Sequence, residues 1–473
     1  MKCIYVLLAV LLFTACLSKN ENKKVNSHAP HPNIILILAD DMGYGDLSCY
    51  GNKLITTPNL DKLAASGIAF TQFYVNSPVC SPSRVSFITG QFPARWNVNS
   101  YFFTKESNKE RNMADYLPAE APSLARQLKK VGYKTGHFGK WHVGGGKGID
   151  DAPMPEAFGY DKALTDKYSM GDKLCMVGEY YDSISALTTP GKAYWVENKH
   201  ELTGIWIDSA LAFVDKNKKE PFYLNLWTYD VHDPLLPAEG GAEKYAGITD
   251  NPYEQKFLAV LDHLDKEMGR FLGELDKKGV MDNTIVIFTS DNGPTDWPEY
   301  YEEGYLPPGS TGPFYGRKWS LYEGGNRMPF ILSWPGHIKE NAWDSTTVFS
   351  AADLFPSLCK LAGAPLPQKQ ELDGEDVSSA WFGEPFSRSK DLYWYYVNDP
   401  QPGKEEHVSP WLAIRSGDWK LLMETDSTGQ QLYNLASDPG ERNNLAKSHT
   451  EITKKLSGRL LEWYNKTQQM NLK

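Results

Sequence analysis

Two acidic pairs follow two apolar segments of the chain and could together hold a metal ion. Asp40 and Asp41 come directly after one β-prone run. Asp291 and Asn292 follow a second such run, from which a single serine separates them. If both runs are parallel strands of one sheet, the two pairs face the same crevice at its carboxyl edge. Three crowded carboxylates repel one another unless a hard cation lies among them, and Ca²⁺ or Mg²⁺ prefers oxygen ligands. The alternative is that each pair only caps a turn or a helix.

A single cysteine stands in a setting that could activate it. Cys80 opens the segment CSPSR, which ends at Arg84 and precedes the apolar stretch 85–89. The stretch could be a helix that the chain enters through a proline-fixed turn. A thiol at a helix N-terminus beside an arginine has a lowered pKa and is nucleophilic. The alternative is a buried structural cysteine.

The elements that must position these residues alternate along the chain. The chain has 473 residues, of which 41% are apolar, and this is more than one core usually fills. Alternating strand and helix patterns predict an α/β fold with a large, mostly parallel central sheet flanked by helices. The predicted strands are 33–39, 222–227, 284–289 and 329–334, and the predicted helices are 59–66, 123–131, 202–215, 255–278 and 351–361.

The composition of the sequence changes after Pro365, where proline, glycine and acidic residues become frequent. Short strand-like runs and a closing helix then predict a small C-terminal α+β subdomain with an antiparallel sheet. We expect a main, catalytic domain over residues 32–380 and the subdomain over 381–473. The predicted subdomain elements are strands 392–397, 411–415, 419–423 and 431–434 and a helix over about 450–466.

The N-terminus predicts export. Residues 1–15 have a basic start, a short apolar stretch and small residues, which is typical of a signal peptide. The segment LFTAC resembles a bacterial lipobox, so Cys16 is the predicted lipidation site and 16–31 a tether; ordinary cleavage nearby is the alternative. Both lead out of the cytoplasm. We expect an envelope lipoprotein, periplasmic or outer-membrane-anchored, that touches the membrane only through its lipid.

Charge and cysteine content exclude further classes. The net charge of -10 and the pI of about 5.6 argue against binding nucleic acid or an anionic membrane by bulk charge. An anionic substrate therefore needs a local cationic pocket. Cys3 leaves with the predicted signal peptide and Cys16 is assigned to the lipid, so four scattered cysteines remain, and they do not make a disulfide framework. These four are Cys49, Cys80, Cys175 and Cys359.

The cysteine segment also carries a family resemblance. Cys80-x-Pro82-Ser83-Arg84 with Thr89-Gly90 resembles the signature of the type I sulfatases of the alkaline phosphatase superfamily, whose cysteine is oxidised to Cα-formylglycine (3-oxoalanine). Other segments resemble motifs of the family and follow one another in the family's order, from about Pro32 to Leu445. This resemblance implies an alkaline-phosphatase-like fold. These segments are 32–46, 57–64, GKWH at 139–142, VHDP at 231–234, SDNG at 290–293, GRK at 316–318, EGG at 323–325, 415–420, 432–435 and 438–441.

The resemblance implies a metal centre and a modified nucleophile. Its metal ligands are Asp40, Asp41, Asp291 and Asn292, with the modified Cys80 as a further one. The expected ion is Ca²⁺, with Mg²⁺ as the alternative. A hydrated formylglycine has two geminal hydroxyls, one to attack sulfur and one to expel sulfate as the aldehyde reforms. An ordinary serine or cysteine lacks the second hydroxyl.

The resemblance also assigns roles to five basic residues. Arg84 and Lys140 are expected to hold the formylglycine oxygens, and Lys318 is expected to bind the sulfate. His142 is the candidate base on the diol. His232 is the candidate sulfate binder and the acid that protonates the departing sugar oxygen.

The expected activity is that of a bacterial polysaccharide sulfatase, a sulfuric ester hydrolase. The expected substrate is a sulfated carbohydrate, either algal, such as ulvan or carrageenan, or a glycosaminoglycan. The expected protein partner is a formylglycine-generating or sulfatase-maturating enzyme. Two alternatives stay open: a phosphodiester or phosphonate monoester hydrolase of the same superfamily, and an inactive glycan-binding lipoprotein.

Two long aromatic loops, 297–315 and 394–411, exceed the usual connection length and are candidate binding loops. Their rings could stack on sugars or simply pack the loops down. The glycine-rich segment 144–148 lacks the spacing of a phosphate-binding loop and is predicted to be a turn. The loop aromatics are Trp297, Tyr300, Tyr301, Tyr305, Trp394, Tyr395, Tyr396 and Trp411.

Overall fold

A computed structural model describes residues 31–144, 152–166, 173–177, 193–397 and 403–471. The predicted signal peptide, Cys16 and almost all of the tether lie outside these residues, as does most of the glycine-rich segment 144–148. Across the described ranges, no helix combines the length and the apolar character that crossing a bilayer requires.

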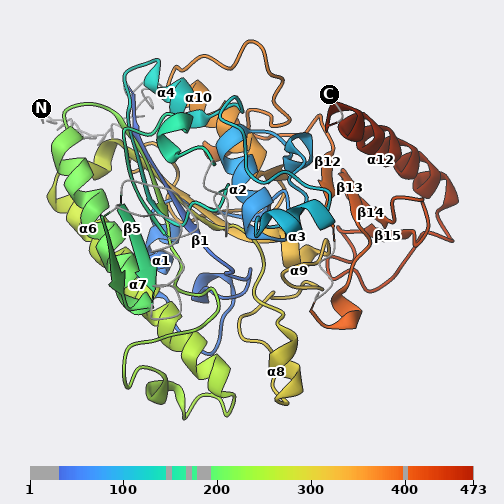
Figure 1. Cartoon of the computed structure of the whole chain (residues 1–473), viewed down its shortest axis with the longest axis horizontal. Coiled ribbons are helices and arrows are strands. Elements are labelled where there is room, and N and C mark those ends of the chain that lie inside the picture. The colour runs from blue at the N-terminus through green and yellow to red at the C-terminus, as the bar shows by residue number, and fades with distance from the viewer. Residues whose placement is uncertain (1–30, 145–151, 167–172, 178–192, 398–402, 472–473) are drawn as a thin grey trace, which may run out of the picture.

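The larger sheet has eleven strands among the described residues (Figure 1). Their bounds are β1 (Asn33–Ala39), β2 (Ile68–Tyr74), β3 (Lys134–Gly139), β4 (Lys162–Asp166), β5 (Lys173–Val177), β6 (Ala193–Glu197), β7 (Phe222–Trp227), β8 (Thr284–Ser290), β9 (Arg327–Ser333), β10 (Ala342–Asp344) and β11 (Phe349–Ser350). The order is β10-β2-β9-β8-β1-β7-β3-β4-β5-β6, and β11 also pairs with β2. Only β9 runs antiparallel to its neighbours, so the predicted mostly parallel sheet is confirmed.

The central strand β1 explains how the two acidic pairs meet. It lies between β7 and β8 and is parallel to both. Its seven residues are all buried, as a strand covered on both faces requires. In the register of β1 with β8, Ala39 is opposite Ser290, so the segments after these residues leave the sheet at the same edge.

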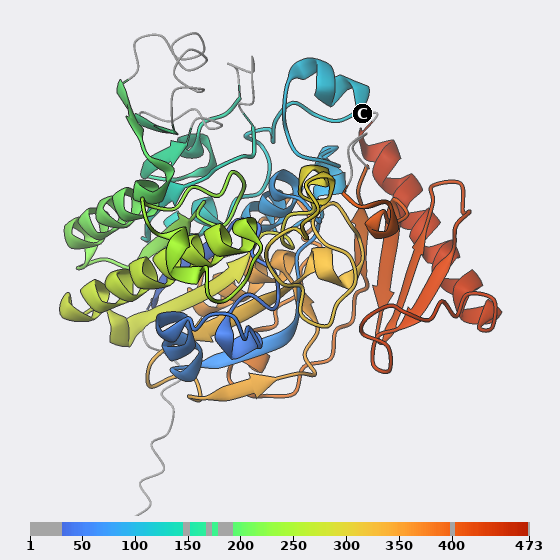
Figure 2. The same cartoon turned by 90° about the horizontal axis from the view of Figure 1, so that it is seen from below.

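Helices cover both faces of this sheet (Figures 1 and 2). Their bounds are α1 (Pro58–Ala65), α2 (Cys80–Thr89), α3 (Lys105–Glu110), α4 (Leu124–Lys129), α6 (Lys199–Asn217), α7 (Pro252–Lys277), α8 (Pro298–Glu302), α9 (Glu323–Asn326), α10 (Leu354–Leu361), α11 (Ser378–Trp381) and α12 (Thr450–Asn471). Alternate β1 side chains enter two cores, as the two-residue period of a strand dictates. Leu36 packs with α2, α4 and α10, whereas Ile37 packs with α1, α6 and α7.

The C-terminal region forms a second, antiparallel sheet, in the order β12-β13-β14-β15, beside α12. Its strands are β12 (Leu392–Tyr395), β13 (Leu412–Ser416), β14 (Trp419–Met423) and β15 (Gln431–Asn434). The predicted subdomain elements are confirmed, with α12 longer than expected. Trp394 and Leu422 of this sheet share a core with Tyr74 of β2 and with Trp319. The subdomain is therefore packed onto the main sheet, and we propose the boundary near residue 380.

Three local features differ from the sequence-based expectation. The strand β3 was not predicted because its sequence, KTGHFG, has no apolar run. The strand β2 was missed because polar residues interrupt it at a register shift between Phe70 and Phe73. The helix after the cysteine segment begins at Cys80 itself and not after the proline, because Pro82 lies in the first turn, where its missing N–H costs nothing.

Candidate active site

The predicted site residues come together at the carboxyl edge of the main sheet. Asp40 and Asp41 follow β1, Asp291 and Asn292 follow β8, and Cys80 is the first residue of α2. The helix α2 also carries Arg84, and the other four stand in loops: Lys140 and His142 after β3, His232 after β7, and Lys318 before α9. All are buried except His232, whose side chain is 19% exposed.

Backbone and amide hydrogen bonds tie the two strand ends to each other. Asp41 has a positive φ of 62°, and its N–H donates to Oδ1 of Asp291 at 3.2 Å. The amide of Asn292 donates to Oδ1 of Asp41 at 2.7 Å. The chain therefore fixes both pairs as one cluster, so they are not separate turn caps.

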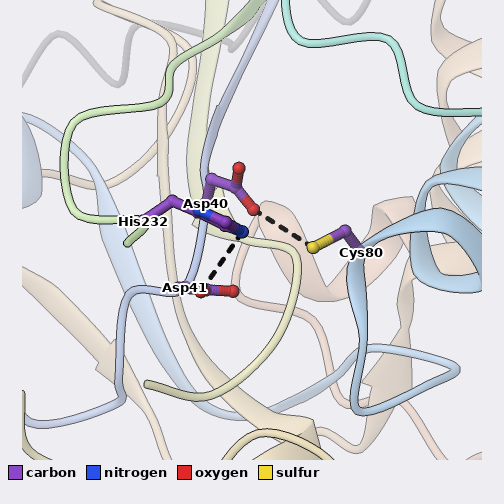
Figure 3. Close-up of side chains that lie close together, drawn as sticks. All are labelled: Asp40, Asp41, Cys80 and His232. Atoms are coloured by element: carbon purple, nitrogen blue, oxygen red, sulfur yellow. Dashed lines mark hydrogen bonds and ion pairs between the residues drawn. The ribbon is translucent and has the colours of Figure 1, made fainter. Parts of the chain in front are cut away.

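Four potential metal ligands form the tightest group (Figure 3). The ligand atoms of Asp40, Asp41, Cys80 and His232 lie within 4.8 Å of one another. Sγ of Cys80 lies 3.4 Å from Oδ1 of Asp40, and Nε2 of His232 lies 3.7 Å from Oδ2 of Asp41. The sequence predicts His232 at the sulfate and not among the metal ligands. One of its ring nitrogens lies within 4.8 Å of the other potential ligand atoms, and its Nε2 lies 3.4 Å from Nζ of Lys318, the predicted sulfate binder.

Three buried cations face the three carboxylates. Nζ of Lys140 lies 2.6 Å from Oδ2 of Asp40 and 3.5 Å from Sγ of Cys80. Nζ of Lys318 lies 2.6 Å from Oδ2 of Asp41 and 3.4 Å from Nε2 of His232.

Arg84 completes this arrangement of cations. Its Nε and Nη2 donate to Oδ2 of Asp291 at 2.9 and 2.7 Å. The same guanidinium lies 3.5 Å from Oδ1 of Asp40. These contacts supply the local positive charge that an anionic substrate requires in an acidic protein.

The titration of the carboxyl groups reflects their crowding. Burial raises the pKa of Asp40, but Lys140 and the other nearby cations outweigh it and hold that pKa well below its usual range. Burial, and then the Asp40 carboxylate, raises the pKa of Asp291 to about 7. Arg84 and Lys140 offset these effects only in part, and a bound cation would further favour the ionised carboxylate.

The thiol of Cys80 is not activated in its encoded form. The side chain is 2% exposed, and burial, followed by the Asp40 carboxylate, raises its pKa far above the usual value. The expected activation at the helix N-terminus is therefore wrong, because desolvation outweighs Lys140 and Lys318. A protonated thiol donating to Asp40 is no thiolate nucleophile, so chemistry at this position needs a different functional group.

The second histidine is held in a fixed orientation. His142 has a positive φ of 51°, and its Nε2 lies 3.2 Å from the carbonyl oxygen of Phe102. Burial, and then the positive charges of Lys140 and Arg84, lowers the pKa of His142 well below its usual value. The imidazole is neutral and can accept a proton, as the predicted base must.

The donor set fits a hard divalent cation. Oδ1 of Asn292 is buried and has no hydrogen-bond partner among the residues that the structure describes. Four other asparagine Oδ1 atoms are in the same condition, so what distinguishes the Asn292 oxygen is its neighbours. It lies in a cluster with three carboxylates, and oxygen is the ligand that Ca²⁺ and Mg²⁺ prefer.

Sequence reasoning missed the residues around His232. Lys199 is the first residue of α6 and is buried, and it donates to the carbonyl oxygens of His232 and Pro234. Burial lowers the pKa of Lys199 to about 8. The ring of Tyr229 stacks on the imidazole. A lysine at a helix start is usually solvated, so no sequence signal separates Lys199 from a surface residue.

Half of the eight loop aromatics are buried inside the protein. Trp394, Tyr395 and Tyr396 are buried, and the indole of Trp394 donates to the carbonyl oxygen of Val75. Sugar stacking is therefore wrong for these three, and packing is the correct alternative. Tyr305 is 37% exposed and remains accessible.

Comparison with known proteins agrees with this geometry. The model of the sulfatase family matches residues 32–364, and that of the N-sulphoglucosamine sulphohydrolase C-terminal region matches residues 311–466. An N-acetylgalactosamine-6-O-sulfatase of Bacteroides thetaiotaomicron is 30% identical, with 95% of this chain and 96% of that protein covered. Human arylsulfatase A is 30% identical, with 88% and 83% covered.

A solved structure agrees with the fold over most of its length. Ps i-CgsB in complex with k-i-k-neocarrahexaose superposes with a TM-score of 0.76 at 28% identity, covering 92% of this chain and 93% of that one. The family match, the relatives and the alkaline-phosphatase-like sheet agree with one another. The chain therefore belongs to the sulfatase family and is a sulfuric ester hydrolase.

Proposed function

We propose that this chain removes sulfate from a sulfated carbohydrate at the centre formed by Asp40, Asp41 and Cys80. The observation that carries the proposal is the position of Cys80, with Asp40 at 3.4 Å and the Lys140 ammonium at 3.5 Å. A nucleophile there stands between a metal-binding carboxylate and a fixed cation. This arrangement suits attack on an anionic sulfur ester.

The proposed metal ligands are Asp40, Asp41, Asp291 and Asn292, together with the modified Cys80. Ca²⁺ is the proposed ion and Mg²⁺ the alternative, since both prefer oxygen ligands. The bound ion would polarise the nucleophile and a sulfate oxygen. The unbonded Oδ1 of Asn292 supports its role as a ligand.

The proposed nucleophile is a formylglycine made from Cys80, so Sγ in this structure marks where one of its hydroxyl oxygens would lie. The hydrated group supplies a hydroxyl for attack and a second one whose deprotonation releases sulfate. Lys140 and Arg84 orient these oxygens. His142 accepts the proton of the second hydroxyl, for which its neutral form is suited.

Lys318 and His232 are proposed to act on the substrate. Their Nζ and Nε2 atoms lie 3.4 Å apart, so both face the space proposed for the sulfate. Burial, and then Lys140 and Lys318, lowers the pKa of His232 well below its usual value, and the negative charge of a bound sulfate ester would counter the effect of these cations and favour the protonated imidazole. Lys318 stays charged because the Asp41 carboxylate outweighs the effect of burial and raises its pKa above the usual value. His232 delivers a proton to the sugar oxygen as the bond to sulfur breaks.

The first substrate to test is 6-sulfated N-acetylgalactosamine. The Bacteroides thetaiotaomicron relative is named for this sugar, and so is a human relative that is 33% identical over 91% of this chain. The carrageenan-derived ligand in the Ps i-CgsB structure makes sulfated algal glycans the next class to screen, and ulvan belongs to the same screen.

The test is sulfate release by the matured, metal-loaded enzyme. We expect turnover of N-acetylgalactosamine 6-sulfate or of an oligosaccharide from the screen, and a loss of at least about 10³-fold in Cys80→Ala. A phosphodiester and a phosphonate monoester serve as controls for the other chemistry of the superfamily. Faster turnover of either control, or glycan binding without any turnover, would contradict the proposal.

We also propose that the chain is an exported lipoprotein of the cell envelope, periplasmic or attached to the outer membrane, with its lipid on Cys16. The support is the signal-like segment 1–15 and the cysteine that follows it. In a bacterial host, Cys16→Ser should move the protein from the membrane fraction to the soluble periplasmic fraction and abolish labelling with a fatty-acid probe. Unchanged labelling of this variant would contradict lipidation at Cys16.

A further inference from the structure

We propose that Lys199 is a positioning residue that holds the His232 imidazole in line with the leaving oxygen of the substrate. This inference rests on the proposed role of His232 as the acid. It concerns a residue that contributes no atom to the metal cluster and that lies in α6, on a different element from every other residue assigned to the site.

The contacts of Lys199 converge on the loop that carries His232. Its ammonium donates to the carbonyl oxygen of His232 itself and to that of Pro234 at 2.8 Å. The two carbonyls flank Asp233, so the lysine clamps the backbone on both sides of one residue. Charge-assisted hydrogen bonds are stronger than neutral ones, and two from one donor fix the direction of the loop.

The ring of Tyr229 extends this clamp to the imidazole. The rings of Tyr229 and His232 stack with centroids 4.9 Å apart and an angle of 16° between their planes. The Lys199 ammonium lies 4.7 Å from the centroid of the tyrosine ring, within the range of a cation–π contact. Lys199 therefore contacts both the backbone of His232 and the surface against which its side chain rests.

Other side chains of the loop are fixed independently. The Thr203 hydroxyl, also on α6, donates to Oδ2 of Asp230, and the Tyr300 hydroxyl of α8 donates to Asp233. The loop therefore keeps its general path without Lys199. What the lysine adds is local orientation at His232, and its loss is expected to change chemistry more than fold.

The burial of the Lys199 ammonium argues against a side chain that only fills space in the core. The residue is 5% exposed, and removing an ammonium group from water is costly unless it is paired and hydrogen-bonded. An apolar side chain would occupy the same space without that cost. The charged group contributes the two carbonyl contacts and the contact with Tyr229, all of which act on the His232 loop.

The dependence of kcat on the leaving group of the substrate distinguishes a positioning role of Lys199 from a general structural role. A poor leaving group needs the proton from His232, whereas a good one departs without it. In a series of aryl sulfates, we expect Lys199→Met to lose about threefold in kcat on 4-nitrophenyl sulfate and about 100-fold on unsubstituted phenyl sulfate. A structural defect would lower both rates by the same factor.

The experiment uses the matured, metal-loaded enzyme, Lys199→Met and four further variants. Lys216→Met removes an exposed lysine from the last turn of the same helix and serves as the matched control. Tyr229→Leu removes the stacking ring, and it tests the same idea if Lys199→Met does not fold. His232→Ala and its double variant with Lys199→Met complete a cycle.

The expected result is a steep leaving-group dependence in Lys199→Met, Tyr229→Leu and His232→Ala, with the double variant no slower than His232→Ala. Equal losses on both substrates in Lys199→Met and Tyr229→Leu, alongside a selective loss in His232→Ala, would overturn the inference and leave the acid role intact. A loss in His232→Ala that does not depend on the leaving group would overturn that role and the inference together.

Discussion

Two of the buried charge clusters among the described residues differ in what their oxygen atoms contact. The catalytic cluster lies at the carboxyl edge of the main sheet, and the interface cluster joins that sheet to the C-terminal subdomain. The catalytic cluster is Asp40, Asp41 and Asp291 with Arg84, Lys140 and Lys318; the interface cluster is Glu323 and Glu441 with Arg327, Arg415 and Lys420.

In the interface cluster, every carboxylate oxygen lies close to a cation or a hydrogen-bond donor of the protein. Lys420 lies 2.9 Å from Oε1 of Glu323 and 3.0 Å from Oε1 of Glu441. The Tyr74 hydroxyl donates to Oε2 of Glu323 at 2.6 Å, and the N–H of Glu323 donates to Oε2 of Glu441 at 2.6 Å. Three of the four carboxylate oxygens thus accept a hydrogen bond, and the fourth, Oε1 of Glu441, accepts none from the described residues but lies at ion-pair distance from Lys420.

The catalytic cluster is incomplete by comparison. Its cations also pair with its acids, but Oδ1 of Asn292 has no partner within the described ranges, and Cys80 is held only by contacts of 3.4 and 3.5 Å. Similar buried charges therefore serve two purposes. The interface cluster shares one lysine between two acids and so joins two parts of the molecule, whereas the catalytic cluster combines three carboxylates with this unpartnered amide oxygen, which suits it to hold an ion.

The largest expected effect is the loss of activity when divalent ions are removed. Dialysis of the matured enzyme against a chelator should lower sulfate release by at least about 10³-fold, because the nucleophile and the sulfate lose their Lewis acid. Addition of Ca²⁺ or Mg²⁺ should restore it, and the ion that does so at the lower concentration identifies the metal. Full activity in a preparation shown by elemental analysis to be metal-free would contradict the account.

The next effect is on stability and tests the interface cluster. Lys420→Met leaves Glu323 and Glu441 buried without their shared cation, which should cost about 3–5 kcal/mol and lower the thermal midpoint. The kcat of the folded protein should change by less than about threefold, since Lys420 touches no site residue. Lys455→Met, in an exposed position of α12, is the control. A metal-binding defect in Lys420→Met would remove the distinction between the clusters.

A variant of Asn292, whose Oδ1 is unpartnered in the described part of the chain, should lose metal binding and activity and keep most of its stability. Asn292→Ala should weaken metal binding by about 100-fold and reduce activity in parallel, because the unbonded Oδ1 is a ligand. Stability without metal should fall by about 2 kcal/mol, since the hydrogen bonds of the amide to Asp41 and to the carbonyl oxygen of Gly293 are lost. Calorimetric titration with Ca²⁺ measures the binding.

The matched control for this position is Asn326→Ala. Oδ1 of Asn326 is also buried and without a partner among the described residues, but it belongs to α9 near the interface cluster. The metal affinity of the Asn326→Ala variant should equal that of the wild type. Equal weakening in both variants would show that the unbonded amide oxygen of Asn292 is incidental.

The smallest expected effect at neutral pH is that of Glu441, which gives the stability a pH dependence. Burial, partly offset by Lys420, raises the pKa of Glu441 from 4.5 to about 7. The folded state then binds this proton more tightly, so its contribution is present below pH 4.5 and is lost as the pH rises to 7.

Glu441→Gln should therefore remove about 3 kcal/mol of that pH dependence between pH 4.5 and 8. The exposed substitution Glu451→Gln, in the first turn of α12, is the control. Thermal midpoints across this pH range make the comparison. A wild-type profile that Glu441→Gln leaves unchanged would mean that Glu441 stays ionised in the folded protein.

Much of this organisation could be predicted from the sequence, because it depends on local patterns. The apolar run of β1 and the acids after it predicted both the central strand and the side of the sheet where the site lies. Cys80, Lys140 and Lys318 lie within short motifs that resemble the family, so their convergence could be expected.

Features that depend on tertiary packing could not be predicted. Lys199 reads as a surface lysine, and only the folded α6 brings its ammonium to the His232 loop. The raised pKa of Cys80 is also invisible, because burial outweighs the helix N-terminus only once α2 is packed against the sheet. Trp394 and Tyr396 resembled binding aromatics for the same reason, since their burial comes from β2 and the subdomain together.

The most direct test of the account is the mass of the tryptic peptide that spans residues 63–84, purified from a host that has the maturation machinery. Conversion of Cys80 to formylglycine predicts a mass about 18 Da below that of the unmodified peptide, in a fraction that tracks the specific activity of the preparation. A fully active preparation in which this peptide retains an unmodified cysteine would contradict the central claim.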